Sequence, residues 1–157
     1  MNGSMWILLP IAWPPHCGKM ITPYWAAVNS AAVANSNRVH SSRTTANCAS
    51  RIRGIQSFHQ GPSRNWSDIA YSWLVCKHGY IFEGRGWNVQ GAHTYGYNSI
   101  NHAVCFLGGD KVGRDDVTDK GREVLAKVIN ESFRLGHGRL VRPHSAVNAT
   151  ACPGNEL

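Results

Sequence analysis

The apolar residues of this chain occur in short runs separated by turn residues, and this spacing limits the folds open to it. The run YSWLV at residues 71–75 and the run YIFE at residues 80–83 are joined by a link that contains His78-Gly79. A third run, AVCFL at residues 103–107, ends at Gly108-Gly109. Short apolar runs bounded by turn residues are typical of strands, so we predict a β-hairpin and a buried central strand.

Two further segments have helical spacing. Apolar side chains recur every three residues from Ala49 to Phe58, which predicts a helix over residues 46–60 that ends at Gly61-Pro62. A second helix is expected to start at Thr118, a residue type that caps helices, and to end at Gly136. Residues 139–142 predict one more short strand. The order of these elements predicts a mixed α/β fold, with a mixed sheet flanked by helices.

The length of 157 residues suits one domain. The longest apolar run, Met5 to Trp13, is broken by Pro10, whereas a membrane span needs about 20 apolar residues, so we expect no membrane span. Residues 1–39 show no clear period and are treated as an N-terminal segment of uncertain structure. We expect the domain itself over residues 40–157.

The charge balance is basic, with 16 Lys and Arg against 9 Asp and Glu, or a net charge of +7. Such a surplus favours an anionic partner: a nucleic acid, a membrane surface or an acidic cell-wall polymer. The basic residues are scattered and no RNA-binding aromatic signature is present, so we expect no nucleic-acid partner.

The chain has five cysteines and no CxxC motif. Cys76 and Cys105 lie at strand-like runs, which predicts buried free thiols and a reducing compartment. A secretory signal peptide is not expected, because Met1 to Ser4 carry no Lys or Arg and the apolar stretch that follows contains proline.

A candidate metal site lies near the end of the chain, in HSAVNATACPG at residues 144–154. His144 and Cys152 are two ligand types, and Pro153-Gly154 forces a turn that could present the thiolate outward. Catalytic zinc takes three protein ligands and keeps a fourth position for water. His40, His59 and His93 are all candidates for the third ligand, and spacing does not choose between them.

Several segments carry a resemblance to a known family, in that family's order. They are VHSSRT (39–44), CASRIRGIQSFHQ (48–60), WSDIAYSWLV (66–75), GYIFEGRGWNVQGAH (79–93), GYN (96–98), AVCFLGG (103–109) and HSAVNATACPG (144–154). Together they resemble the N-acetylmuramoyl-L-alanine amidases of the peptidoglycan recognition protein and phage-lysozyme type. The resemblance implies a zinc ion (Zn2+) held by His40, His144 and Cys152, in a groove on one face of the sheet.

The resemblance also implies a reaction, the hydrolysis of the peptidoglycan amide that joins N-acetylmuramic acid to L-alanine. Two neutral imidazoles and one thiolate would leave zinc with a net charge near +1, so that its bound water ionises near pH 7. Tyr71 and Thr150 would position that water or stabilise the oxyanion. The general base is left open. The plainer alternatives are a core aromatic for Tyr71 and a turn hydroxyl for Thr150.

The implied substrate-binding residues are His59, Trp66, Arg85, Trp87, His93 and Asn98. Arg85 could pair with a carboxylate of the stem peptide, because a guanidinium binds carboxylates through two hydrogen bonds. A plain surface charge for Arg85 and a core position for Trp66 are the alternatives.

The sequence departs from the family pattern in several places. Family members carry an apolar strand before the first zinc histidine, whereas VANSNRV at residues 33–39 is polar. Animal members pair a cysteine at position 48 with one at the position of Ser67, so we expect Cys48 to be a free thiol. Relatives also continue past the position of Leu157 into a final helix, so we expect a domain without that helix, as in a piece of a longer modular lysin.

We therefore expect a monomeric zinc amidase that acts on peptidoglycan, as in a phage endolysin or a bacterial cell-wall hydrolase. Such an enzyme would stay in the host bacterial cytoplasm before its release to the wall. A non-catalytic peptidoglycan-binding module and a regulator that binds another protein are the alternatives. Cys152 favours the enzyme, because receptor-only members of the family usually lack this cysteine.

Overall fold

One mixed sheet forms the centre of the molecule. The computed structural model describes residues 4–9, 38–108 and 117–152, with side chains described from residue 45 onward. The elements are β1 (Ser4–Leu9), α2 (Arg38–Gln60), β2 (Trp73–Cys76), β3 (Tyr80–Glu83), β4 (His102–Phe106), α3 (Asp119–Arg134), β5 (Leu140–Pro143) and the short helix η1 (His144–Ala146). The strand order is β3-β2-β4-β1-β5. The β2–β4 pair is parallel and the other pairs are antiparallel, so the predicted mixed α/β fold is confirmed.

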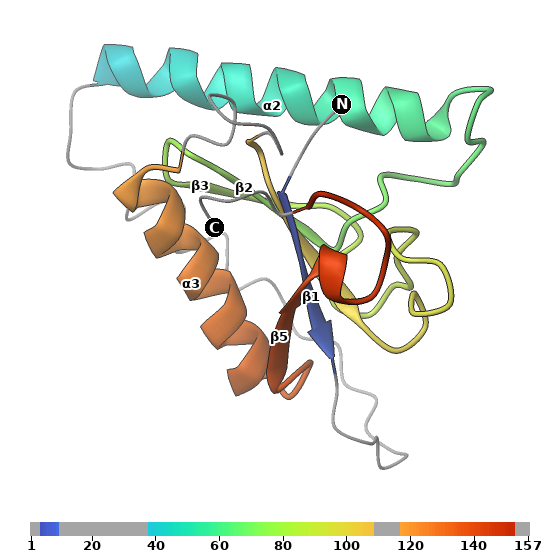
Figure 1. Ribbon diagram of the computed structural model, residues 1–157. Coiled ribbons are helices and arrows are strands. Elements are labelled where there is room, and N and C mark those ends of the chain that lie inside the picture. Colours follow the sequence, from blue (N-terminus) through green and yellow to red (C-terminus); the bar gives the residue numbers. More distant parts are fainter. Residues whose placement is uncertain (1–3, 10–37, 109–116, 153–157) are drawn as a thin grey trace.

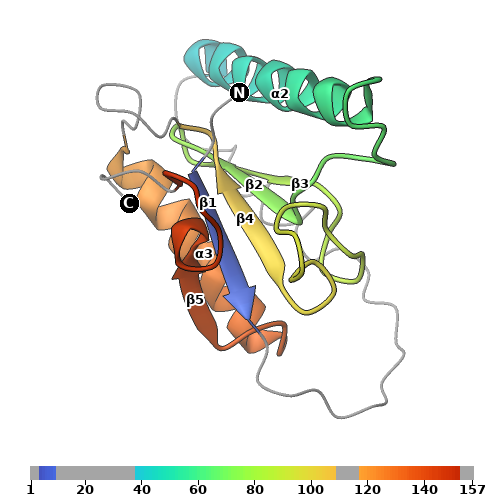
Figure 2. The same cartoon turned by 45° about the vertical axis from the view of Figure 1, so that its right-hand side comes forward.

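The two long helices cover opposite faces of this sheet (Figures 1 and 2). Side chains along a strand point alternately to the two faces. In β2, Trp73 and Val75 pack with α3, whereas Leu74 and Cys76 pack with α2. We call these the α3 face and the α2 face. Strand β4 alternates in the same way, and its Cys105 joins the α2 face.

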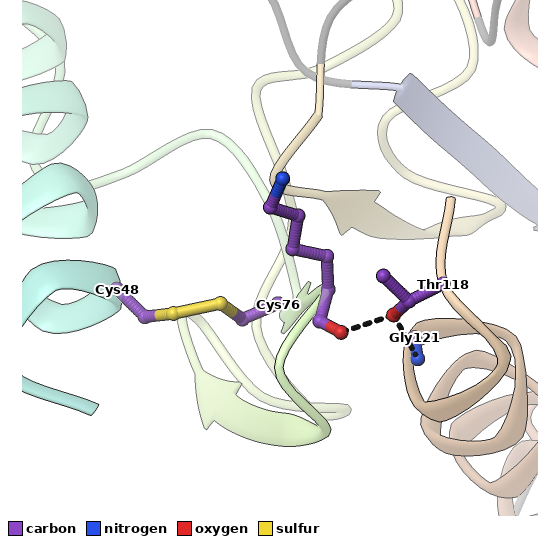
Figure 3. Close-up of a disulfide and its surroundings, with 5 residues drawn as sticks. Cys48, Cys76, Thr118 and Gly121 are labelled. Carbon is purple, nitrogen blue, oxygen red and sulfur yellow. Dashed lines mark hydrogen bonds between the residues drawn. A yellow bond between two sulfur atoms is a disulfide. The ribbon is translucent and has the colours of Figure 1, made fainter. Parts of the chain in front are cut away.

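Helix α3 begins directly after Thr118, the capping residue that the sequence predicted. The Thr118 hydroxyl accepts a hydrogen bond from the Gly121 N–H at 3.1 Å and donates to the Lys77 carbonyl, which ties the helix start to the β2–β3 turn (Figure 3). Gly121 lets α3 approach the sheet closely, because a Cβ there would lie 2.8 Å from the Phe106 ring.

Strand β1 was not predicted, although it lies between β4 and β5 in the sheet. It pairs Met5 with Cys105 and Leu9 with Leu140. Its residues form a continuous apolar run, and periodicity alone cannot distinguish such a run from a buried helical segment.

Helix α2 begins at Arg38, eight residues before the predicted start. Residues 38–45 read RVHSSRTT, which is polar and carries no apolar stripe that could mark a helix. The family resemblance placed a strand before His40, at residues 33–39. Residues 33–37 lie outside the described residues, and Arg38 and Val39 belong to helix α2.

The prediction of a free Cys48 is wrong. Cys48 of α2 is disulfide-bonded to Cys76 of β2, so the partner is not at the position of Ser67, and Cys76 is not a free thiol (Figure 3). Within the described ranges, Cys105 and Cys152 take part in no disulfide. The helices of that same part of the chain include none long and apolar enough to cross a bilayer.

Candidate active site

The candidate site lies on the α2 face, beyond the end of α2, and Tyr71 is at its centre. Tyr71 packs beside Ala103 and Val147, and its side chain hydrogen-bonds with the buried thiol of Cys105. Burial is the main cause of a strongly raised Tyr71 pKa, and the neighbouring Cys105 and Cys152 thiols raise it further. The phenol is therefore neutral at physiological pH and able to donate a hydrogen bond.

The segment after β5 brings His144 and Cys152 together. The Ser145 N–H donates to the Cys152 carbonyl at 3.0 Å, which closes the loop between the two residues. The Asn148 N–H donates to the His144 carbonyl at 3.0 Å. Cys152 also lies close enough to Tyr71 to affect its pKa, so this loop delivers a thiol to the same place as the phenol.

The groups on this loop are suited to metal binding. Burial lowers the pKa of His144, so its imidazole is neutral at neutral pH. Its Nε2 lies 3.2 Å from the Asn148 side-chain nitrogen, whereas Nδ1 has no partner among the described residues. The Cys152 N–H donates to the Thr150 hydroxyl at 3.3 Å, so Thr150 orients the cysteine. A neutral imidazole and a thiol are two of the ligand types that zinc takes.

The third predicted ligand, His40, lies in the first turn of α2, in a part of that helix where side chains are not described. His59, at the other end of the same helix, lies beside Tyr71, and at a rise of about 1.5 Å per residue the helix carries the His40 backbone about 28 Å along its axis from His59. The role of His40 therefore stays a prediction. Within the described ranges, no third histidine, cysteine or carboxylate joins His144 and Cys152 within the reach of one ion.

Those ranges hold one cluster of three ligand types, Cys48, Cys76 and His78, whose ligand atoms lie within 4.8 Å of one another. Two of the three are the disulfide pair. Zinc binds thiolates, so this cluster cannot bind it through sulfur while the disulfide is intact.

His59 and Trp66 form an aromatic wall beside Tyr71. The His59 ring lies 4.9 Å from the Trp66 ring and meets the Tyr71 ring edge-on at 5.7 Å. Burial, and then the charges of Arg64 and Arg85, lower the pKa of His59. The neutral ring accepts from the Ala70 N–H at Nδ1 (3.2 Å), which leaves the proton on Nε2.

His93 lies on the loop between β3 and β4. It is 9 % exposed, and burial lowers its pKa to about 3, with a smaller effect from the charges of His102 and His144. Asn98 holds this loop, because its side-chain oxygen accepts from the N–H groups of His93 and Thr94, both at 2.8 Å. Gly91 is required here, since a Cβ would lie 2.2 Å from the His93 ring.

Arg85 has a positioning role in this structure. Its guanidinium donates to the backbone carbonyls of Ile69 (2.6 Å), Gln90 (2.9 Å) and Asp68 (3.1 Å). It therefore joins the segment before Tyr71 to the segment before His93.

The predicted substrate residues divide between the two faces. Trp87 belongs to the α3 face, where it packs against Trp73 at 5.3 Å. His59, Trp66 and Tyr71 lie together on the opposite side of the sheet. Cys105 and Asn148 were not predicted as residues of this site. The signals in the sequence were the shared strand face of Ala103 and Cys105 and the four-residue spacing of Asn148 from His144.

Comparison with known proteins identifies the family. The chain is 37% identical to mouse N-acetylmuramoyl-L-alanine amidase over 123 residues, covering 73% of this chain and 22% of that protein. It is 40% identical to Drosophila melanogaster peptidoglycan-recognition protein LE over 108 residues, covering 68% and 31%. The crystal structure of human PGRP-IBETAC in complex with glycosamyl muramyl pentapeptide is 33% identical with a TM-score of 0.62, covering 72% of this chain and 69% of that chain. The chain belongs to the peptidoglycan recognition protein family.

No protein-family model matches the chain. The chain spans 22% to 40% of the length of the first three curated relatives. A second structural relative, peptidoglycan recognition protein-LE in complex with tracheal cytotoxin, is 38% identical with a TM-score of 0.62, covering 69% of this chain and 64% of that one.

The predicted location in a bacterial host cytoplasm is wrong. These sequence relatives come from mouse, human and fruit fly, not from phages or bacteria. The Cys48–Cys76 disulfide also argues against the predicted cytoplasmic location, because disulfides persist mainly in oxidising compartments.

Proposed function

We propose that this chain binds peptidoglycan on the α2 face and hydrolyses the amide between N-acetylmuramic acid and L-alanine. One observation carries the proposal: the segment after β5 joins a neutral imidazole, His144, and the thiol of Cys152 in one hydrogen-bonded loop, and Cys152 lies beside the neutral phenol of Tyr71. Relatives in this family include a named amidase and proteins solved with peptidoglycan fragments.

His144 and Cys152 would hold a zinc ion in this proposal. His40 is the third ligand that the family resemblance implies, and the continuous helix α2 places it about 28 Å along the axis from His59, so this ligand set would need the start of α2 to lie nearer the site. When bound, zinc supplies a Lewis acid and lowers the pKa of a bound water. Burial keeps His144 neutral, so a ring nitrogen remains available as a ligand near neutral pH. Thr150 holds the Cys152 backbone in place.

The residues around this centre would bind and polarise the substrate. The Tyr71 hydroxyl, protonated because of its burial, would donate to the oxygen that becomes negative as the amide carbonyl is attacked. His59 would donate from Nε2, since its Nδ1 is occupied by the Ala70 N–H. His59, Trp66 and His93 would contact the muropeptide, with Arg85 and Asn98 holding the loops.

Substitutions of His144, Cys152 and His78 test the metal site. We expect the purified chain to contain near-stoichiometric zinc and to release L-alanine amino ends from peptidoglycan, and His144→Ala and Cys152→Ser to lose both. His78→Ala is the matched control, because His78 is exposed and belongs to the other cluster. Zinc lost from His78→Ala but retained by His144→Ala would contradict the proposed centre.

A non-catalytic peptidoglycan receptor is the second candidate function. It is favoured by the two, rather than three, ligands found together among the described residues, and by the many relatives named as recognition proteins. Binding of peptidoglycan by the parent chain, without zinc and without release of L-alanine, would decide for the receptor.

A further inference from the structure

A second pocket lies at the end of the sheet where β4 begins. Its volume is about 340 Å3, which is in the range of small-molecule sites. The lining residues are Trp87, Asn88, Val89, Gln90, Asn98, Ser99, Ile100, Asn101, His102 and His137. Trp87 belongs to the α3 face and Tyr71 packs on the α2 face, so the two sites are centred on opposite faces of the sheet, although Asn98 and Gln90 of the pocket lining also contact the loop that carries His93 and Arg85.

Two of the lining residues, Trp87 and Asn101, carry buried polar atoms that no described residue satisfies. Asn101 is 4 % exposed, and neither its side-chain oxygen nor its side-chain nitrogen has a hydrogen-bond partner. Trp87 is 9 % exposed, and its indole N–H is also without a partner. Buried polar groups are nearly always hydrogen-bonded, so a set of two donors and one acceptor points to a missing ligand.

Ring contacts in the pocket wall hold the Trp87 side chain in place. The Trp87 ring stacks on His137 at 5.2 Å with an interplanar angle of 11°, and meets the His102 ring edge-on at 5.3 Å. His102 is held in turn by Ser72, whose hydroxyl lies 3.4 Å from its Nδ1. A site built from packed rings is preorganised for binding.

The pocket lining is uncharged and includes two exposed apolar side chains. No lining residue is Asp, Glu, Lys or Arg. Burial lowers the pKa values of His102 and His137, so both rings are neutral at neutral pH. Val89 and Ile100 are 51 % and 52 % exposed, and the polar lining residues Asn88, Gln90 and Ser99 are exposed as well. A neutral ligand with an apolar flank suits this environment better than an ion.

We propose that this pocket binds a secondary amide. The amide oxygen would accept from the Trp87 indole N–H and the Asn101 side-chain N–H, and the amide N–H would donate to the Asn101 side-chain oxygen. The apolar flank of the ligand would lie against Val89 and Ile100. Two sources offer this group, the acetamido group of an N-acetylated sugar and a peptide bond. The proposal does not depend on amidase activity.

Nuclear magnetic resonance titration tests the pocket directly. The probes are N-acetylglucosamine, N-acetyl-L-alanine N-methylamide, and glucose as the control without an amide. We expect saturable shifts of the Asn101 side-chain amide and Trp87 indole signals with one or both amides, and none with glucose. A response to the sugar alone identifies a glycan source, and a response to the peptide analogue alone identifies a peptide source.

Two negative results would overturn the proposal. One is the absence of shifts with both amides, and the other is a response confined to residues of the α2 face such as His59 and Tyr71. These outcomes leave the proposed amidase site unaffected, because that site is measured by zinc content and L-alanine release.

Substitutions in the pocket provide a second test of the proposal. Asn101→Leu keeps the size of the side chain and removes its polar atoms, so we expect at least a tenfold weaker affinity with an unchanged circular dichroism spectrum. Asn88→Ala, at an exposed position of the same pocket, is the matched control and should stay within twofold of the parent. Ile100→Ala, also exposed, should weaken binding severalfold even where Asn101→Leu does not fold. Parent-like affinity in a folded Asn101→Leu variant would refute the assignment.

Discussion

Tyr71 is the residue at which the polar parts of the candidate active site meet. It contacts the His59 ring, hydrogen-bonds with the Cys105 thiol, and is electrostatically coupled to Cys152. Its raised pKa keeps the hydroxyl protonated, so in the proposed reaction this group would donate a hydrogen bond.

Replacement of this hydroxyl should separate binding from turnover. We expect Tyr71→Phe to retain zinc and peptidoglycan binding and to lower the rate of L-alanine release by about 10²–10³, the effect of removing one donor to an oxyanion. Zinc analysis, a wall pull-down and the rate measurement check the three parts. An unchanged rate would remove Tyr71 from the proposed mechanism.

At the scale of elements, α3 is attached to the sheet through its first residues. Thr118 caps the helix and also donates to the Lys77 carbonyl on the β2–β3 turn. We expect Thr118→Ala to lower the free energy of unfolding by about 1–2 kcal/mol, because both hydrogen bonds are lost. Urea unfolding measures this, and Thr118→Ser is the control that should keep most of the stability.

The disulfide connects α2 to β2 and closes a loop of sequence separation 28. Closing a loop of this length is expected to stabilise the fold by about 3–4 kcal/mol in the chain-entropy account. The Cys48→Ala/Cys76→Ala double variant should lose about this much free energy of unfolding. The parent measured in dithiothreitol should match the variant, and the variant should not respond to the reductant. Equal stability of parent and variant would mean that the covalent link is unimportant.

At the scale of the whole molecule, buried neutral histidines make the fold sensitive to acid. The folded-state pKa values are lowered to about 3 for His93 and about 4 for His102, against an unfolded value near 6.5. The unfolded chain therefore binds protons first, and stability present above pH 6.5 is lost as the pH falls toward 4. Each group contributes up to about 1.4 kcal/mol per pH unit.

Unfolding by urea at pH 7 and pH 5 measures this loss. The difference in stability between the two pH values should be smaller in His102→Gln than in the parent. His78→Gln, a change at an exposed histidine, should retain the full difference. A parent-like pH dependence in His102→Gln would contradict the assignment.

The sequence predicted those parts of the fold that local chemistry determines. The hairpin, β4 and the Thr118 cap follow from short apolar runs and from one capping hydroxyl. The early part of α2 and strand β1 were missed, because a polar helical turn and a continuous apolar run carry no period. The Cys48–Cys76 pairing depends on how α2 lies across β2, and no local pattern encodes that contact.

The candidate site was predictable only in part, for the same reason. The spacing of His144 and Cys152 indicated one loop, and the structure closes that loop with the Ser145–Cys152 hydrogen bond. The backbone contacts of Arg85 and the position of Trp87 on the α3 face depend on long-range packing. Residue type does not reveal such packing, so the sequence suggested only substrate contacts for Arg85 and Trp87.

The place of β1 in the sheet has a consequence for how this molecule is made. β1 is synthesised before the rest of the sheet, yet its two neighbours, β4 and β5, follow much later in the sequence, with Leu9 paired to Leu140. Until β5 has emerged, one edge of β1 has no partner, and unpaired strand edges promote aggregation. Completion of the sheet must therefore wait for the β5 segment, and β1 is the strand that stays longest without its native partners during synthesis.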